Sequence, residues 1–421
     1  MTSVCGLDFG TSNSTAGWVV DAQPRLLALE DDKFTLPSAV FFNAENQQVS
    51  FGRAALAEYL SGEEGRLMRS LKSLLGSSLL DGHTEVLGRK IPFRDLLRFF
   101  IQELKRRAEQ AAGRSFERAV LGRPVFFVDE DPQADQLAED TLRQTALDCG
   151  FREVSFQYEP IAAAFDYEQQ VTREELVLIV DIGGGTSDFS LIRVSPQRRH
   201  LDERRDDILA NAGVHIGGTD FDRRLSLAAV MPLLGYRSKL RHRDAEVPSS
   251  YYFNLATWHT INQAYTRKVW AELQDVKRDV AEPGRFARLL QLVEQRAGHA
   301  LAIAVEQAKI ELSSQPETVL ELDQLSPPLQ HVLSGQQLAD AIDADLKRIT
   351  QTVTGLLQQA GVRAEQVDTV FFTGGASGVS SLRQQVQRLL PGSRPVEGDL
   401  FGSIGAGLAL AAHRRYGGMN A

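Results

Sequence analysis

The hydrophobic positions of this chain form two kinds of segment. Some are short apolar runs, and others are longer stretches with helical spacing. Apolar runs at 4–7, 14–20 and 26–29 predict strands near the N-terminus, and a continuous run at 176–181 predicts a strand buried on both faces. Apolar residues three and four positions apart predict helices over 93–111, 135–149, 289–312, 339–360 and 380–390. This mixture of strands and amphipathic helices is typical of an α/β protein.

Three predicted strands run into turns that are rich in glycine and small hydroxyl residues. The turns are Gly10-Thr11-Ser12, Gly183 to Thr186 and Gly374 to Gly378. Glycine lets several backbone N–H groups approach one anion closely, as the phosphates of a nucleotide require. One such turn is more often structural than functional, but three at strand ends favour nucleotide binding. The chain has neither a Walker-type loop nor a dinucleotide fingerprint after its first strand.

Two of these turns belong to similar segments, Cys5 to Asn13 and Ile179 to Asp188. Each places an aspartate at the strand end, Asp8 or Asp181, followed by a glycine two residues later and by small hydroxyl residues. This similarity indicates an internal duplication, and it predicts two related lobes that face each other across a cleft. Paired carboxylates suit magnesium, whereas the alternative is a pair of aspartates that only cap turns.

Length and charge narrow the class of protein. The chain has 421 residues, which exceeds the size at which a single core stops growing, about 250–300 residues. Its net charge of −9 argues against a nucleic-acid partner. The N-terminus does not resemble a signal peptide, and no apolar run is long enough to span a membrane. We therefore expect a two-lobed cytoplasmic protein that binds neither nucleic acid nor membranes.

The ordered motifs resemble those of the heat-shock-70 (DnaK-type) family along essentially the whole chain. The matching segments are 6–14, 35–40, 71–76, Glu159-Pro160 with three alanines, 181–188, 217–222, Ala308-Lys309 to Ser313-Ser314 and Thr373-Gly374-Gly375. Gly122-Arg123-Pro124 and 156–160 are most similar to the YegD-like bacterial branch. The spacing departs from the family between Gly218 and Glu306, where this chain is longer.

The resemblance implies an actin-like ATPase fold, with two lobes that each hold a mixed five-stranded sheet and flanking helices around a nucleotide cleft. We expect residues 1–175 and 397–421 to form lobe I. Residues 176–396 would form lobe II, with an enlarged inserted subdomain at 216–344. The aromatic residues of that insertion either enlarge its core or form a face for a partner; they are Tyr251, Tyr252, Phe253, Trp258, Tyr265 and Trp270.

The resemblance also implies ATP or ADP with Mg²⁺ as ligands, and K⁺ as a further candidate ion. The expected catalytic residues are Lys72, which places the attacking water, Asp181 as base or water orienter, and Glu159, Thr11 and Thr186. Magnesium would be held mostly through water by Asp8, Glu159 and Asp181. The nucleotide would be bound by Asp8, Gly10, Thr11, Ser12, Asn13, Gly183, Gly184, Gly185, Thr186, Gly217, Gly218, Glu306, Lys309, Ser313, Gly374, Gly375 and Ser377. Without the neighbouring motifs, the simplest interpretation of Lys72 would be a surface lysine on an amphipathic helix.

Two departures from the family affect the expected function. The family sandwiches adenine between two arginines, and the matching positions here are Ile310 and Gly378. Neither can stack as a guanidinium does, so Arg285 or Arg296 from the insertion is considered as a substitute. We also expect the chain to lack the peptide-binding domain of a full chaperone, because it ends after the last helix of the nucleotide part.

The favoured function is a slow, magnesium-dependent ATPase that opens and closes its lobes and is related to chaperones. A non-catalytic nucleotide-dependent sensor or adaptor is the main alternative, favoured by the missing arginines. A small-molecule kinase and a filament-forming relative of actin fit the motifs less well. We expect a monomer that acts on a protein partner, whose identity the sequence does not indicate.

Overall fold

The computed structural model describes residues 4–86, 89–128, 131–201, 204–242, 244–399 and 402–417. Its first sheet has the strand order β11-β10-β1-β2-β3, with β4 paired to β2. These strands are β1 (Val4–Phe9), β2 (Asn13–Val20), β3 (Gln23–Leu26), β4 (Thr35–Pro37), β10 (Arg118–Arg123) and β11 (Glu153–Tyr158). The sheet is mixed, since β1 runs parallel to β10 and antiparallel to β2. Short β4 makes it six-stranded rather than five-stranded.

Two amphipathic helices share the core of the first sheet, α2 (Phe93–Ala112) and α3 (Pro132–Asp148). Both were expected from their apolar spacing. The third strand was predicted at 26–29, but β3 ends at Leu26. Leu27 and Leu29 are apolar because they are buried in this core, not because they belong to a strand.

The second sheet has the order β14-β13-β12-β17-β18 and is also mixed. Its strands are β12 (Glu175–Ile182), β13 (Ser187–Val194), β14 (Ile208–Val214), β17 (Thr369–Thr373) and β18 (Arg394–Glu397). Helices α10 (Gly335–Ala360) and α11 (Ser380–Leu389) belong to its core. The helix α10 begins at a capping box on Ser334 and ends at Gly361, whose φ of 64° suits glycine.

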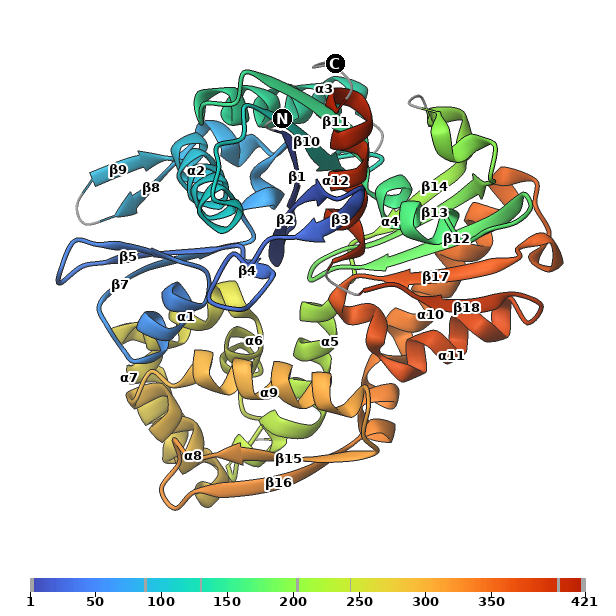
Figure 1. Cartoon of the computed structure of the whole chain (residues 1–421). Coiled ribbons are helices and arrows are strands. Elements are labelled where there is room, and N and C mark those ends of the chain that lie inside the picture. Colours follow the sequence, from blue (N-terminus) through green and yellow to red (C-terminus); the bar gives the residue numbers. More distant parts are fainter. Residues whose placement is uncertain are drawn as a thin grey trace.

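Two helices lie between the sheets, α4 (Glu159–Glu168) and α12 (Ser403–Tyr416) (Figure 1). They pack against each other, and α12 also contacts β1, β2 and β10. Their shared core includes Ala162, Leu408, Val120 of the first sheet and Ile179 of the second. A side chain at Gly407 would overlap the backbone of Ala162. The two helices therefore approach closely enough to join both sheets in one unit.

The long segment between β14 and α10 forms a mostly helical subdomain at the lower part of Figure 1. Its elements are α5 (Gly218–Leu225), η5 (Ser226–Val230), η6 (Met231–Leu234), α6 (Ser250–Ala256), η7 (Trp258–Tyr265), α7 (Arg267–Lys277), α8 (Pro283–Glu294), α9 (Gly298–Leu312), β15 (Glu317–Leu322) and β16 (Leu329–Ser334). Tyr251 and Tyr252 are buried in a core that continues into the second sheet, whereas Phe253 is 45% exposed. Among the described residues, the core of the insertion is therefore continuous with the core of that sheet.

The single helix predicted over 289–312 is two helices, α8 and α9. The chain breaks between them, where Arg296 has a φ of 53°, and Gly298 N–H donates a hydrogen bond to Tyr265 Oη (2.8 Å). The apolar spacing runs through the break because Val293 and Leu301 pack into the same core. Periodicity alone cannot reveal a turn whose flanking helices share one core.

A smaller sheet lies opposite the insertion, at the left of Figure 1. It has the order β6-β5-β7. This region contains β5 (Ala39–Asn43), β6 (Val49–Phe51), β7 (Gly65–Arg69), α1 (Gly52–Leu60), the short helical turns η1 (Leu71–Leu74) and η2 (Ser78–Asp81), and the hairpin of β8 (His83–Val86) and β9 (Arg89–Pro92). Other short helical turns are η3 (Arg198–His200), η4 (Arg205–Asp207), η8 (Ala364–Gln366) and η9 (Gly375–Gly378).

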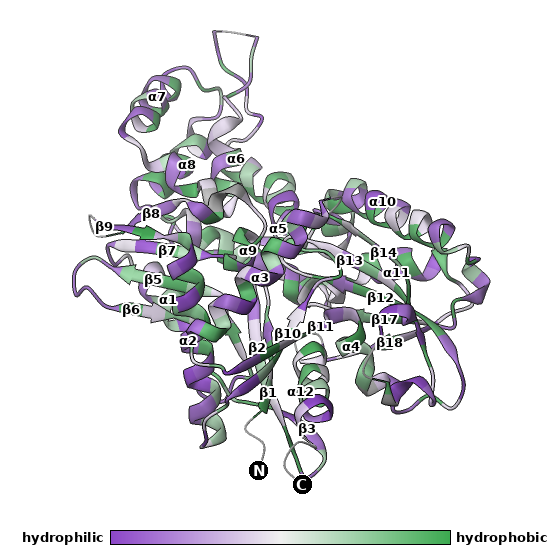
Figure 2. Ribbon diagram, turned by 90° about the horizontal axis from the view of Figure 1, so that it is seen from above, coloured by the Kyte–Doolittle hydropathy of each residue, from purple (hydrophilic) through white to green (hydrophobic). Residues whose placement is uncertain are grey.

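The hydropathy of the chain follows this layered arrangement. Figure 2 shows hydrophobic residues on β1 and along α12, in the lower part of this view, and both colours on outer helices such as α2 and α7. Within the described residues, no helix combines the length and the apolar character needed to cross a membrane.

Candidate functional site

A cavity of about 740 Å³ lies where the two larger sheets, the small sheet and the insertion meet. The predicted site residues line this cavity, with the exceptions of Gly217 and Ser377. Further lining residues that were not among the predicted site residues include Arg69, Phe126, Phe127, Asp188 and Asp222, of which the last two end motif segments. The motifs are therefore brought together in space although they span most of the chain.

The two similar glycine turns approach each other from opposite sheets. Gly10-Thr11-Ser12 connects β1 to β2, and Gly183 to Thr186 connects β12 to β13. A Cβ atom on Gly184 would overlap the Ser12 hydroxyl. With glycine at this position the two turns approach closely without displacing the Ser12 side chain, and their backbone N–H groups are brought to one place.

Each turn is supported from behind by hydrogen bonds. Ser38 donates from its hydroxyl to Gly10 O (2.7 Å) and from its backbone N–H to Ser12 O (2.8 Å). In the second turn, Gly218 N–H donates to Gly183 O (2.9 Å). Gly217 packs beneath this turn, because a Cβ there would lie 2.6 Å from the carbonyl group of Gly184. It therefore supports the turn and does not face the cavity.

The third glycine turn follows β17 and packs against the end of β12. Gly374 has a φ of 78°, and a side chain there would overlap a carboxylate oxygen of Asp181. The buried Ser377 hydroxyl donates to Gly374 O (2.8 Å). Ser377 therefore holds the shape of the turn from inside, which is why it does not line the cavity as we expected.

The charged centre of the cavity is built around Lys72 on η1. Its Nζ donates to Glu159 Oε1 at 2.6 Å, and both side chains are largely buried. Burial and the neighbouring Glu159 raise the pKa of Asp8 to about 7. Burial, Asp188 and Glu159 raise the pKa of Asp181 well above its usual range. Although burial lowers the pKa of Lys72, Glu159 and Asp8 together raise it. The alternative of a surface lysine does not apply.

The donor set fits a hydrated magnesium ion. Asp8, Glu159 and Asp181 all line the cavity and offer oxygen atoms. Burial raises the pKa values of both aspartates, and repulsion from neighbouring carboxylates adds to the shift. A cation would relieve this repulsion. In the part of the chain that the structure describes, no three His, Cys, Asp or Glu side chains form a direct metal-ligand cluster. Magnesium commonly keeps several waters and shares the phosphates of a substrate, which such a dispersed set of carboxylates accommodates.

The opposite end of the cavity lies against α9 and α5. Lys309 Nζ lies 2.8 Å from Asp222 Oδ1 and donates to Gly218 O (3.3 Å). Burial raises the pKa of Asp222 to about 6 against the opposing effect of Lys309. Glu306 also lines this end. Asp222 closes the motif segment 217–222, so the sequence contained the signal for it.

The positions that lack the family's arginines also lie at this end. Ile310 and Gly378 line the cavity, and Ile310 is 52% exposed. The substitutes considered from sequence, Arg285 and Arg296, are not among the residues that line it. Arg285 instead pairs with Glu282 at the start of α8 (3.2 Å), because the insertion folds α8 away from the cavity.

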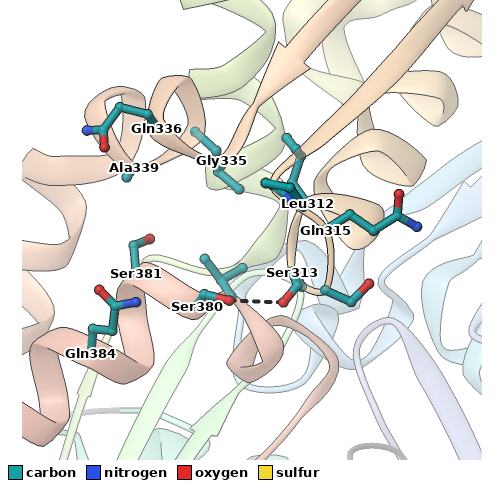
Figure 3. A pocket seen from close by; sticks show the side chains of 13 residues that line it. Leu312, Ser313, Gln315, Gly335, Gln336, Ala339, Ser380, Ser381 and Gln384 are labelled. Carbon is teal, nitrogen blue, oxygen red and sulfur yellow. Dashed lines mark hydrogen bonds between the residues drawn. The ribbon is translucent and has the colours of Figure 1, made fainter.

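A second cavity of about 370 Å³ adjoins this end, between the end of α9 and the starts of α10 and α11. Figure 3 shows Gln336 and Gln384 on two of its sides and a hydrogen bond from Ser380 Oγ to Ser313 O (2.9 Å). Its lining side chains are uncharged. Ser313 and Val379 line both cavities, so the second cavity is the immediate neighbour of the first.

Comparison with known proteins agrees with this arrangement. The family model described as Hsp70 protein matches residues 83–231 and 289–412. The unmatched stretch between these segments falls in the insertion. The chain is 24% identical over 418 residues to "Chaperone protein DnaK" of Thermosipho africanus, covering 97% of this chain and 58% of the relative. It is equally similar to the protein of the same name from Thermosipho melanesiensis, with 97% and 59% covered.

A third relative, "Chaperone protein DnaK" of Mycoplasmoides gallisepticum, is 24% identical over 401 residues and is covered to 56% of its length. The chain thus spans less than two thirds of these relatives. The family match covers more than half of this chain, and the mixed sheets with flanking helices agree with the predicted actin-like ATPase fold. This chain belongs to the Hsp70 family.

Proposed function

We propose that this protein binds ATP together with Mg²⁺ in the large cavity and hydrolyses the ATP slowly. The observation that carries the proposal is the pairing of Lys72 with Glu159 between Asp8 and Asp181, at the point where two glycine turns converge. Phosphoryl transfer depends on positioning the phosphate and on neutralising its charge. The glycine turns can position the phosphate, and the Lys72 ammonium can neutralise its charge.

The chain's own residues would divide these tasks. The backbone N–H groups around Gly10 to Ser12 and Gly183 to Thr186 would bind the phosphate oxygens. The Lys72 ammonium would neutralise charge on the terminal phosphate and orient the attacking water. Asp181, whose pKa is raised by burial and by Asp188, would accept the proton of that water on a carboxylate oxygen. When bound, magnesium supplies further positive charge beside the phosphates.

The division into lobes is part of the proposal. Residues 1–175 and 397–421 would form lobe I, and residues 176–396 would form lobe II with the insertion at 216–344. The separate cores of the two larger sheets support this division. The helices α4 and α12 would act as the joint, because they form a third core between the sheets. Binding of ATP would favour closed lobes, and loss of phosphate would favour open ones.

The relatives named "Chaperone protein DnaK" support a chaperone-related role for this chain. We place it in the YegD-like branch on the basis of the segments around Pro124 and Pro160. We also infer that it is a cytoplasmic monomer that acts on a protein partner. These inferences depend on the family resemblance, and they are independent of the chemistry at Lys72.

The decisive experiment measures phosphate release from ATP by the purified protein, with and without magnesium. We expect release that requires magnesium and is lost in Lys72→Ala, while ATP binding is retained. Lys347→Ala is the matched control, because Lys347 forms an exposed pair with Asp343 on α10 (2.7 Å). Unchanged release in Lys72→Ala would refute the assigned role of Lys72.

A non-catalytic nucleotide sensor is the second candidate. It is favoured by Ile310 and Gly378, which leave the expected base-stacking positions without a guanidinium. This candidate predicts that ATP raises the melting temperature while phosphate release stays at the background rate, in the wild type as in Lys72→Ala. The same pair of measurements therefore separates the two functions.

A further inference from the structure

Arg69 occupies the cavity at the end where the two family arginines are missing. In the described part of the chain it is the only arginine that lines this cavity. It is the last residue of β7, three positions before Lys72. Ser70, between them, has a φ of 57° and turns the chain into η1. One short segment therefore presents Lys72 at the carboxylate centre and Arg69 beside α9.

The guanidinium of Arg69 is held by an aromatic ring from the insertion. Its Cζ lies 4.3 Å from the centroid of the Trp258 indole. Trp258 in turn packs edge-on against His299 of α9, with ring centroids 4.8 Å apart. Arg69 thus reaches across the cleft from the small sheet, and the insertion fixes the ring that supports it.

The guanidinium still has unused binding capacity. No hydrogen bond or ion pair joins it to another residue within the described ranges, unlike Lys309, which pairs with Asp222. Burial lowers the pKa of Arg69, and the negative charges of Glu306 and Asp222 oppose this shift. An arginine stays charged in proteins and carries five donors in one plane. Because Trp258 covers one face, the other face and the N–H groups are left for a ligand in the cavity.

We propose that Arg69, supported by Trp258, is the residue on which the base of the bound nucleotide stacks. The proposal rests on the ATP-binding function argued above, and it names the residue that determines which nucleotides are accepted. A flat cation attracts an aromatic ring through the electrons of its face. The base would complete a stack of indole, guanidinium and heterocycle, in place of the two arginines that Ile310 and Gly378 cannot replace.

This arrangement has two consequences for specificity. Stacking is tolerant of base identity, because every base has an aromatic face, so ATP and GTP should bind with similar affinity. Purines offer a larger ring than pyrimidines, so UTP should bind more weakly. The stack also contains one residue from each side of the cleft, so a bound base would hold Arg69 and Trp258 together.

Calorimetric titration with Mg·ATP, Mg·GTP, Mg·UTP and magnesium tripolyphosphate tests the proposal. Arg69→Lys keeps the charge and removes the plane, so we expect the affinity for ATP to fall about tenfold, with tripolyphosphate affinity unchanged. Trp258→Leu should lower the affinity for ATP and leave the affinity for tripolyphosphate unchanged. It provides a second test if Arg69 variants fold poorly. Arg66→Lys, an exposed arginine on the same strand, is the matched control and should bind as the wild type.

The outcomes separate this proposal from the general function. If the wild type binds neither ATP nor tripolyphosphate, the proposed nucleotide site itself is wrong. If the wild type binds ATP and Arg69→Lys binds it equally well, only the role of Arg69 is refuted. If Arg69→Lys loses affinity for ATP and for tripolyphosphate to the same extent, stacking is also refuted, because Arg69 would then contact phosphate.

Discussion

Tyr59 Oη lies 2.8 Å from Nδ1 of His299, a residue 240 positions later in the chain. Tyr59 is on α1 beside the small sheet, and His299 is the second residue of the helix α9 that carries Glu306 and Lys309. The two rings meet edge to face, with centroids 4.7 Å apart. This contact joins α1, beside the small sheet, to the insertion, so it must break if the two move apart.

Tyr59→Phe tests whether this contact holds the cleft closed. The variant keeps the ring packing and loses the hydroxyl that contacts His299 Nδ1 (2.8 Å) and donates to Asn262 Oδ1 (3.3 Å). A hydrogen bond of this kind is worth about 1 kcal/mol net. We expect a bound fluorescent ATP analogue to dissociate roughly threefold to tenfold faster, measured by stopped-flow displacement. Tyr251→Phe removes a tyrosine hydroxyl inside the insertion and should leave the rate unchanged. Equal dissociation rates in Tyr59→Phe and wild type would contradict the prediction.

His299 predicts a pH dependence of stability. Burial lowers its pKa to about 4, and Arg69 adds to this shift. The unfolded state takes up a proton as pH falls below about 6.5, whereas the folded state resists it. The free energy of unfolding therefore falls as the pH is lowered from about 6.5 toward 4. Near pH 5 the loss is on the order of 1 kcal/mol.

Urea unfolding of His299→Gln between pH 7.5 and pH 5 measures this contribution. The variant should lose less stability over this interval than the wild type, because it has no imidazole to protonate. His242→Gln changes a histidine that is mostly exposed and should follow the wild-type curve. Parallel curves for His299→Gln and wild type would show that the imidazole does not contribute.

Gly217→Ala should damage the site without touching the cavity. The added Cβ would meet the backbone of Gly184 and Gly185 at 2.6 Å, and backbone cannot move aside as a side chain can. We expect a lower melting temperature and ATP affinity reduced by at least about tenfold. Gly185→Ala is the matched control for stability, since among the described residues no atom beyond its two chain neighbours lies within 4 Å of its added Cβ. Equal melting temperatures for both variants would refute this role of Gly217.

Asp8→Asn should stabilise the protein in the absence of ligands at neutral and higher pH. The folded-state pKa of Asp8 is raised to about 7 by burial and Glu159, so the unfolded state releases its proton first as pH rises. Stability is therefore lost as pH rises from about 4 to about 7, and the amide avoids this loss. Melting curves should show a larger gain at pH 8 than at pH 5, together with the loss of magnesium-dependent ATP binding.

Asp244→Asn, at a fully exposed carboxylate, should change neither melting nor binding and serves as the control for Asp8→Asn. A gain for Asp8→Asn that is equal at pH 5 and pH 8 would mean that the raised pKa is not its cause. Retained magnesium dependence of ATP binding would mean that Asp8 does not help to hold the ion.

Much of the fold and of the site was predictable from short segments. The turns at Gly10, Gly183 and Gly374 were recognisable because a glycine after a buried strand reflects a local backbone requirement. The buried strand β12 and the helix α10 were recognisable because burial imposes a local period. Asp8 and Asp181 were predicted to share a cleft because their segments are alike, and both line the cavity.

Other features depend on contacts between distant segments. The break between α8 and α9 arises where Tyr265 binds Gly298, and the supporting positions of Gly217 and Ser377 arise from neighbours that the motifs do not contain. The replacement arginine was sought in the insertion, at Arg285 or Arg296, but within the described ranges the arginine that lines the cavity is Arg69. No local pattern marks Arg69, because its partner Trp258 is 189 positions away in the sequence.

The sequence by itself determined the glycine turns, the strand-end aspartates and the family, since each follows from residues close together in the chain. Only the tertiary structure decided which side chains meet: Lys72 with Glu159, Lys309 with Asp222, Tyr59 with His299 and Arg69 with Trp258. The physical reason is that turn conformation is a local property of the backbone. Burial and electrostatic pairing, in contrast, depend on which surfaces pack together, and that is settled by the whole chain.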